Sequence, residues 1–138
     1  MRKEVFHLSL RPDLEKIGVK AIGGKFYATS HMPCDGMWEA CANVWGWGGR
    51  SKTTAKVRRV CLYLVSLKEG DEVEEIEGMA TPSIVVRPGL NRHGTVRRCR
   101  ARLVETRIVR PSEAILNEIA RQPFRAALYR AIMASRET

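Results

Sequence analysis

The sequence predicts an α+β fold, in which a small mixed or antiparallel sheet carries one internal helix and further helices at the C-terminal end. Three observations predict it. Short apolar runs with strand-like alternation recur along the chain, one segment has apolar residues at helical spacing, and the last part shows proline-flanked helical patterns. Apolar residues make up 44% of the 138 residues, which is enough to bury one core. We therefore expect a single domain over residues 1–138.

The first part of the chain is expected to contain two strands and the internal helix. Residues 5–10 alternate as a strand does, and residues 25–29 form a second strand after a pair of glycines. A helix is predicted over residues 33–45, because the following apolar residues recur at helical spacing: Met37, Trp38, Cys41, Val44 and Trp45.

The second part opens with the clearest strand of the sequence, residues 57–67. Its alternate positions are apolar on both faces, so we expect this strand to be central in the sheet. A strand over residues 83–87 and one or two strands within residues 96–110 follow, separated by a turn-rich stretch. Ser112 can cap a helix over residues 113–121, and Pro123 opens another helix with an apolar stripe.

The chain shows no pattern for export, membrane insertion or metal binding. Its first apolar stretch ends at Arg11 and Pro12, too early for a signal peptide or a membrane span. We therefore expect an intracellular, cytoplasmic protein that does not associate with membranes. None of the four cysteines, Cys34, Cys41, Cys61 and Cys99, belongs to a CxxC pair. Reduced thiols and no metal site are expected; the alternative is a site that combines His31, Cys34 and Cys41, for which the sequence offers no evident fourth ligand.

The formal net charge of +9 is unevenly distributed along the chain. Residues 50–67 contain five basic residues and no acid, and residues 79–111 contain eight arginines against the single acid Glu105. Such an excess favours polyanions or acidic partners, and the planar guanidinium suits phosphate and carboxylate groups. The alternative is a solvated strand face with no ligand. The residues expected to bind a nucleic acid or an acidic protein are Arg50, Lys52, Arg58, Arg59, Arg97, Arg98 and Arg100.

If these arginines form a functional surface, both basic stretches should lie on one face of the molecule. Arg58 and Arg59 are then expected beside Arg97, Arg98 and Arg100.

A second set of residues follows the predicted strands in a particular order. His7 lies in the first strand, Tyr27 lies in the second, and the acids Asp71, Glu72 and Glu74 follow the strand over residues 57–67. This order resembles the small ADP-ribosyltransferases of the rifampin ADP-ribosyltransferase type. In that family a strand histidine, a strand tyrosine and a downstream acid build a cleft for NAD. The likeness covers residues 5–113 in organisation, through motifs of a few residues each.

The resemblance implies a mono-ADP-ribosyltransferase that consumes NAD and modifies an unknown acceptor. His7 and Ser9 would bind the cofactor, with the histidine on the ribose, and Tyr27 would stack on the nicotinamide ring. Glu72 or Glu74 would stabilise the positive charge that develops as the glycosidic bond breaks, with Asp71 as a further candidate. Under this hypothesis the histidine and the tyrosine open into one pocket.

The alternative function is a noncatalytic basic binding module. Such a module is either a phage-type inhibitor that occupies the nucleic-acid site of a host complex or a direct nucleic-acid binder. Here the first motif reads His7-Leu8-Ser9, where the transferase family usually has His-Gly-Thr. A transferase-like fold that has been reused for binding is consistent with both sets of observations. In the simplest structural interpretation, His7 is a hydrogen-bonded strand residue, Tyr27 is a core aromatic, and the acids form a solvated turn.

Overall fold

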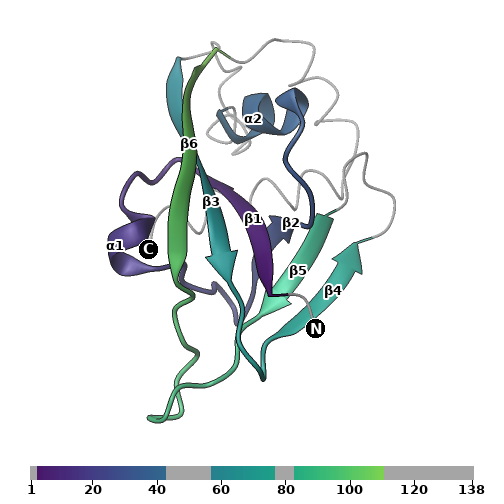
Figure 1. The fold of residues 1–138 in the computed structure, drawn as a ribbon, viewed down its shortest axis with the longest axis vertical. Coiled ribbons are helices and arrows are strands. Elements are labelled where there is room, and N and C mark those ends of the chain that lie inside the picture. Colours follow the sequence, from purple (N-terminus) through teal and green to yellow (C-terminus); the bar gives the residue numbers. More distant parts are fainter. Residues whose placement is uncertain (1–2, 43–56, 77–82, 111–138) are drawn as a thin grey trace.

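The computed structural model describes residues 3–42, 57–76 and 83–110 (Figure 1). The elements within these ranges are, in chain order, β1 (Glu4–Ser9), α1 (Leu14–Ile17), β2 (Phe26–Thr29), α2 (Asp35–Ala42), β3 (Arg58–Ser66), β4 (Glu72–Ile76), β5 (Ser83–Arg87) and β6 (Ala101–Val109). The strands form one antiparallel sheet in the order β4-β5-β2-β1-β3-β6.

The α+β class expected from the sequence is confirmed, as a six-stranded antiparallel sheet with short helices in the described ranges. Its likeness to the ADP-ribosyltransferase fold stays a prediction. The helices expected after residue 112 and the last residues of the helix predicted over 33–45 lie outside the described residues. No helix within the described ranges is both long enough and apolar enough to cross a membrane.

Five of the six strands lie where the apolar patterns predict them, and β4 is the exception. From the sequence, the acids of this segment are expected to form a solvated turn. In the structure they pair with β5 from Glu72↔Arg87 to Ile76↔Ser83 and form an edge of the sheet. Hydrogen bonding to a neighbouring strand outweighs the low strand propensity of glutamate, and charged side chains are common on edge strands.

The strand β3 lies inside the sheet, between β1 and β6, although β1 and β2 occupy the middle positions. Its pairing with β1 runs without interruption from Ser66 to Cys61. Its pairing with β6 has an irregularity between Leu62 and Tyr63. Because it has a partner on each edge and apolar residues on each face, β3 joins the two layers of the core.

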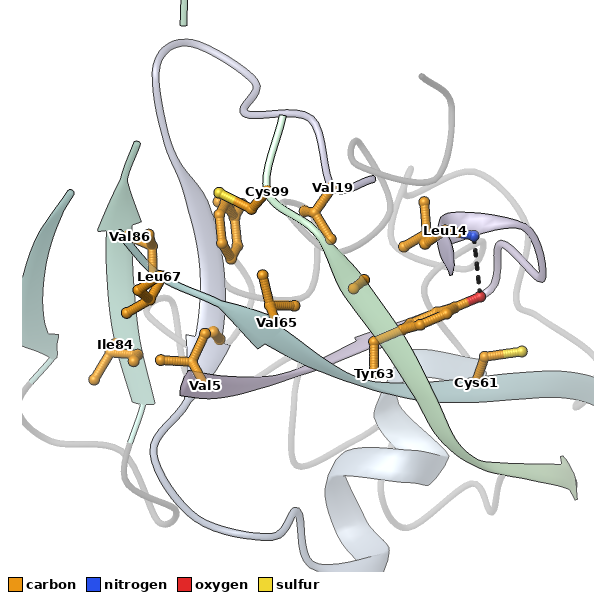
Figure 2. Close-up of a cluster of buried hydrophobic side chains, with 13 residues drawn as sticks. Val5, Leu14, Val19, Cys61, Tyr63, Val65, Leu67, Ile84, Val86 and Cys99 are labelled. Carbon is orange, nitrogen blue, oxygen red and sulfur yellow. Dashed lines mark hydrogen bonds between the residues drawn. The ribbon is translucent and has the colours of Figure 1, made fainter. Parts of the chain in front are cut away.

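Each face of the sheet carries its own apolar cluster, because successive residues of a strand point to opposite faces. One cluster lies beneath α2 and contains Leu8, Met37, Trp38, Cys41, Ala42, Val60, Leu62 and Val109. The other lies on the α1 side and is the cluster drawn in Figure 2; it includes Val5, Leu14, Val19, Phe26, Tyr63, Val65, Ile84 and Val86. Strands β1 and β3 contribute to both clusters.

Tyr63 connects the second cluster to the turn before α1. Its side chain is fully buried, and its hydroxyl donates to the Arg11 carbonyl oxygen at 2.5 Å and accepts from the Leu14 amide at 3.4 Å. Figure 2 shows the ring directed from β3 toward Leu14. Burial raises the pKa of the Tyr63 hydroxyl, so this group stays protonated at neutral pH and keeps donating.

The Tyr63→Phe substitution is expected to lower the free energy of unfolding by about 1–2 kcal/mol. The ring and its packing remain, but the Arg11 carbonyl and the Leu14 amide lose this partner. Urea unfolding followed by circular dichroism measures the change. Tyr27→Phe is the matched control, because the half-buried Tyr27 hydroxyl has no hydrogen bond to a described residue. Equal effects of the two substitutions would contradict the role given to the Tyr63 hydroxyl.

Candidate functional site

His7 and Tyr27 lie on neighbouring strands, but their side chains point to opposite faces of the sheet. Strand β1 pairs with β2 at Phe6↔Thr29, so residues directly opposite each other share a face and the next residues alternate. His7 lies opposite Tyr63 on the α1 side, whereas Tyr27 packs against the cluster beneath α2. The prediction that the two side chains open into one pocket is wrong, because the sheet lies between them.

His7 is a structural residue in this fold. Its side chain is 1% exposed, and its ring lies edge-on to Phe26 with 5.5 Å between the ring centroids. Its Nδ1 lies 2.7 Å from the carbonyl oxygen of Tyr27. Since a carbonyl can only accept, Nδ1 carries the proton of a neutral ring. Burial lowers the pKa of His7 to about 4, which keeps the ring neutral near pH 7.

Ser9, the other expected cofactor ligand, is also occupied inside the fold. Its side chain is completely buried, and its Oγ accepts a hydrogen bond from the Arg11 amide at 3.0 Å. This bond shapes the turn between β1 and α1. Neither His7 nor Ser9 therefore presents its side chain to a ligand in solution.

The acids Glu72 and Glu74 are distant from His7, but they lie on the same face of the sheet as Tyr27, because Tyr27 and Glu74 both pair with Val85. They lie on the edge strand β4, which β5 and β2 separate from β1. Three strand spacings place them about 14 Å from β1. Glu74 forms an exposed ion pair with Arg87 at 2.7 Å. The sheet thus separates His7 from Tyr27, Glu72 and Glu74.

The two basic stretches lie at opposite ends of β3. Arg58 pairs with Val109 at the start of the strand, whereas the Ser66 amide at its other end donates to the Arg100 carbonyl oxygen at 2.9 Å. A strand of this length separates the two ends by about 26 Å. The prediction that both stretches share one face is wrong, because β3 and β6 run antiparallel and Arg58 and Arg59 alternate between faces. Arg50 and Lys52 lie outside the described residues.

Arg97, Arg98 and Arg100 line a surface hollow of about 610 Å³, which we call the basic hollow. It lies where α1, the end of β3 and the segment before β6 meet. Its charged lining residues are Glu15, Lys16, Lys68, Arg97, Arg98 and Arg100, and the others are Ile17, Gly18, Ser66, Leu67 and Cys99. Five cations and one carboxylate therefore surround one cavity.

Backbone hydrogen bonds fix the wall of the basic hollow. Val19 and Cys99 exchange a pair of them, with N···O distances of 2.8 and 2.9 Å. Gly18 precedes this bridge with a φ of 76°, and a Cβ atom there would lie 3.0 Å from the Cys99 carbonyl oxygen. Only glycine accommodates both the conformation and the close approach. The end of α1 is thus held against the arginine-bearing segment.

A buried carboxylate positions one side of the hollow. The Asp71 side chain is 1% exposed and accepts hydrogen bonds from the amides of Lys68 and Gly89, each at 2.8 Å. It also accepts two from the Arg97 guanidinium, through Nε at 3.2 Å and through Nη2. Burial by itself raises the pKa of Asp71, but the hydrogen bonds from these donors outweigh it and hold the pKa below its usual range.

Asp71 therefore has a different role from the one that the sequence order implies. Its two oxygens are occupied by donors of its own chain, so it acts as a structural anion and not as a catalytic acid. Arg97 has a similar structural role, because its guanidinium donates two hydrogen bonds to Asp71. Sequence reasoning missed this pair, since the two residues are 26 positions apart and no local pattern connects them.

The other cations of the hollow have no such partner in the described part of the chain. Lys16, Lys68, Arg98 and Arg100 are exposed, and none of them forms an ion pair with an acid in the described part of the chain. The carboxylate of Glu15 accepts from the Leu103 amide at 2.9 Å. Four positive charges thus face solvent around one cavity, which is an arrangement that attracts anions. The two lysines lie outside the dense basic runs of the sequence, so charge density along the chain does not single them out.

Cys99 lines the hollow but is not a nucleophile. It is completely buried, and burial raises the pKa of its thiol to about 11. The thiolate, which is the reactive form, is therefore scarce at neutral pH. The described residues contain no group of three or more His, Cys, Asp or Glu side chains that could hold a metal ion.

Comparisons of the chain with protein-family models, with curated proteins and with solved structures found no match. The function proposed below therefore rests on the geometry and the charge of this chain's own residues.

His7 is expected to make the protein less stable as the pH falls from 6.5 to about 4. In this window the unfolded chain binds a proton at the histidine while the folded protein does not. The contribution of His7 to the free energy of unfolding is complete above pH 6.5 and is about 3 kcal/mol smaller at about pH 4. Urea unfolding across this range should show a shallower pH dependence for His7→Gln, which keeps a donor for the Tyr27 carbonyl but does not titrate. Parallel curves for the two proteins would contradict the lowered pKa.

The Asp71→Asn substitution is expected to lower the free energy of unfolding by about 2–4 kcal/mol. It removes the charge that pairs with Arg97 and directs an NH₂ group at donors that need an acceptor. Amide hydrogen exchange at Gly89 should accelerate as well. Glu72→Gln, which alters an exposed carboxylate of β4, should change the free energy of unfolding by less than about 0.5 kcal/mol. An Asp71→Asn protein with an unaltered free energy of unfolding would show that the buried carboxylate is dispensable.

Proposed function

We propose that this protein is a noncatalytic binding module whose basic hollow holds the phosphate backbone of a nucleic acid. The observation that carries the proposal is a set of four exposed cations around one cavity that form no ion pair with an acid among the described residues: Lys16, Lys68, Arg98 and Arg100.

The charge density of the hollow favours a polyanion over a singly charged ligand. Four like charges around one cavity raise the local potential, and an anion that enters relieves their mutual repulsion. A nucleic-acid strand carries one negative charge about every 3.4 Å, so several phosphates reach the hollow together. The guanidinium groups of Arg98 and Arg100 can each bond two phosphate oxygens. An acidic protein would need a run of adjacent carboxylates to supply the same density of negative charge.

The geometry does not favour ADP-ribosyl transfer from NAD, which stays a prediction of the sequence resemblance. That hypothesis needs His7, Tyr27 and an acid in one cleft. Here the histidine is buried on one face, the tyrosine packs on the other, and Glu72 and Glu74 lie on an edge strand. The binding hypothesis needs no such cleft, because phosphate contacts require only exposed and correctly placed cations.

The double charge reversal of Arg98→Glu with Arg100→Glu is expected to weaken nucleic-acid binding at least roughly tenfold at moderate salt. Fluorescence anisotropy with a labelled oligonucleotide measures the affinity. Loss of two phosphate contacts should also make the plot of log affinity against log salt less steep by about 2. The matched control reverses Arg59 and Arg110, two exposed arginines toward the other end of β3 and β6. It changes the net charge equally and should have a much smaller effect.

Three outcomes would contradict the proposal. The first is binding that does not depend on salt, and the second is an equal loss of affinity in the control pair. The third is transfer of label from NAD to an acceptor in a lysate that disappears with Tyr27→Ala. This last result would favour the transferase hypothesis instead.

A further inference from the structure

Residues 89–97 form a small hairpin between β5 and β6, which we call the 89–97 hairpin. Leu90 and Val96 form an antiparallel bridge, and the Arg97 amide donates to the Gly89 carbonyl oxygen at 3.0 Å. In Figure 1 the connection between β5 and β6 extends beyond the lower end of the sheet, away from both helices. The hairpin therefore projects from the molecule instead of packing on it.

The tip of the hairpin is held by its own hydrogen bonds. The Asn91 amide donates to the Thr95 carbonyl oxygen at 2.7 Å, and the Asn91 Oδ1 accepts from the amides of His93 and Thr95 at 2.9 and 3.1 Å. Gly94 takes the left-handed conformation that the turn requires, with a φ of 81°. These contacts give the tip a defined shape without a core.

The base of the hairpin is anchored at the edge of the basic hollow. Asp71 accepts from the Gly89 amide on one strand of the hairpin and from the Arg97 guanidinium on the other. Arg98 follows directly and lines the hollow. The position of the hairpin relative to the exposed cations of the hollow is thus fixed by a buried carboxylate.

The side chains of the hairpin are available to a ligand. Leu90 is 66% exposed and Val96 is 42% exposed, so this bridged apolar pair faces water. The side chains of Arg92 and His93 are exposed at the tip, and neither side chain forms an ion pair or a hydrogen bond with a described residue. An apolar pair on a projecting ribbon stabilises the fold little, whereas an apolar surface beside cations is suited to binding.

We propose that the 89–97 hairpin inserts into the major groove of a DNA duplex while the basic hollow holds the phosphates beside that groove. In this arrangement Arg92 donates to the O6 and N7 atoms of a guanine, and Leu90 and Val96 contact thymine methyl groups. The inference rests on the proposed function, because it assigns the contacts that make nucleic-acid binding specific.

The dimensions of the hairpin agree with this ligand. The major groove of B-form DNA is about 12 Å wide and about 8.5 Å deep, and it admits a two-stranded ribbon. The residues from Gly89 to Arg92 span roughly 10 Å, which is sufficient to reach the base edges. The phosphates border the groove, where the base of the hairpin and Arg98 would lie. Double-stranded RNA is a poorer fit, because its major groove is deep and too narrow for side chains to read.

The test compares Arg92→Ala with Arg110→Ala, which removes one exposed arginine from the end of the sheet remote from the hairpin. Anisotropy titrations use a guanine-containing duplex of about two turns and the same sequence as a single strand. The wild-type protein should bind the duplex more tightly than the single strand. Arg92→Ala should weaken duplex binding roughly tenfold and leave single-strand binding nearly unaltered, whereas Arg110→Ala should change either affinity less than about twofold.

A modified duplex locates the contact in the groove. Replacing guanine by 7-deazaguanine removes the N7 acceptor without altering base pairing. The wild-type protein should bind the modified duplex more weakly than the ordinary duplex. The Arg92→Ala protein should bind the two duplexes with equal affinity. Leu90→Ser with Val96→Ser, an exposed pair whose replacement leaves the core intact, should also weaken duplex binding.

Equal affinity for duplex and single strand, or equal effects of Arg92→Ala and Arg110→Ala, would overturn groove insertion. The proposed function would still stand in either case if Arg98→Glu with Arg100→Glu abolished binding. If a polyglutamate peptide bound more tightly than any nucleic acid, an acidic protein would be the partner and both proposals would be wrong.

Discussion

The interaction between Asp71 and Arg97 is the constraint on which the rest of the site depends. One buried carboxylate accepts from the turn after β3, from Gly89 two residues after β5, and from the arginine that precedes β6. Burying a charge is costly unless donors surround it, and here each oxygen has two. Because these donors come from three separate segments, the pair holds the end of β3, the base of the hairpin and the rim of the basic hollow in one arrangement.

The arginines divide into two groups according to their partners. Those paired with acids support the fold: Arg97 bonds Asp71, while Arg107 stacks 4.2 Å over the Trp38 ring and bonds Asp35 at the start of α2. By contrast, Arg92, Arg98 and Arg100 face solvent without an acidic partner in the described part of the chain. Mutual repulsion among such cations opposes folding, so a ligand that neutralises them would also stabilise the protein. The proposed binding surface is the end of the sheet where Arg98 and Arg100 line the basic hollow together with Lys16 and Lys68.

The alternation of side chains in β1 and β2 keeps His7 and Tyr27 out of one pocket. His7 and Tyr27 are on adjacent strands, as their order in the sequence implies, but the pairing of Phe6 with Thr29 sends their side chains to opposite faces. A shift of one residue would have placed them together. The register follows from burying Leu8 beneath α2 and Phe26 on the α1 side, so packing of the core fixes which polar groups can meet.

The sequence by itself determined the α+β class and five of the six strands, because alternating apolar residues must face a core whatever the topology. It also identified Arg97, Arg98 and Arg100 as candidates, since charge density is visible along the chain. Only the tertiary structure decided that Arg58 and Arg59 lie far from them, that Lys16 and Lys68 join them, and that β4 is a strand. Each of these outcomes depends on pairing between segments remote in sequence. Strand order and register come from burying both faces of one sheet together, which no local pattern encodes.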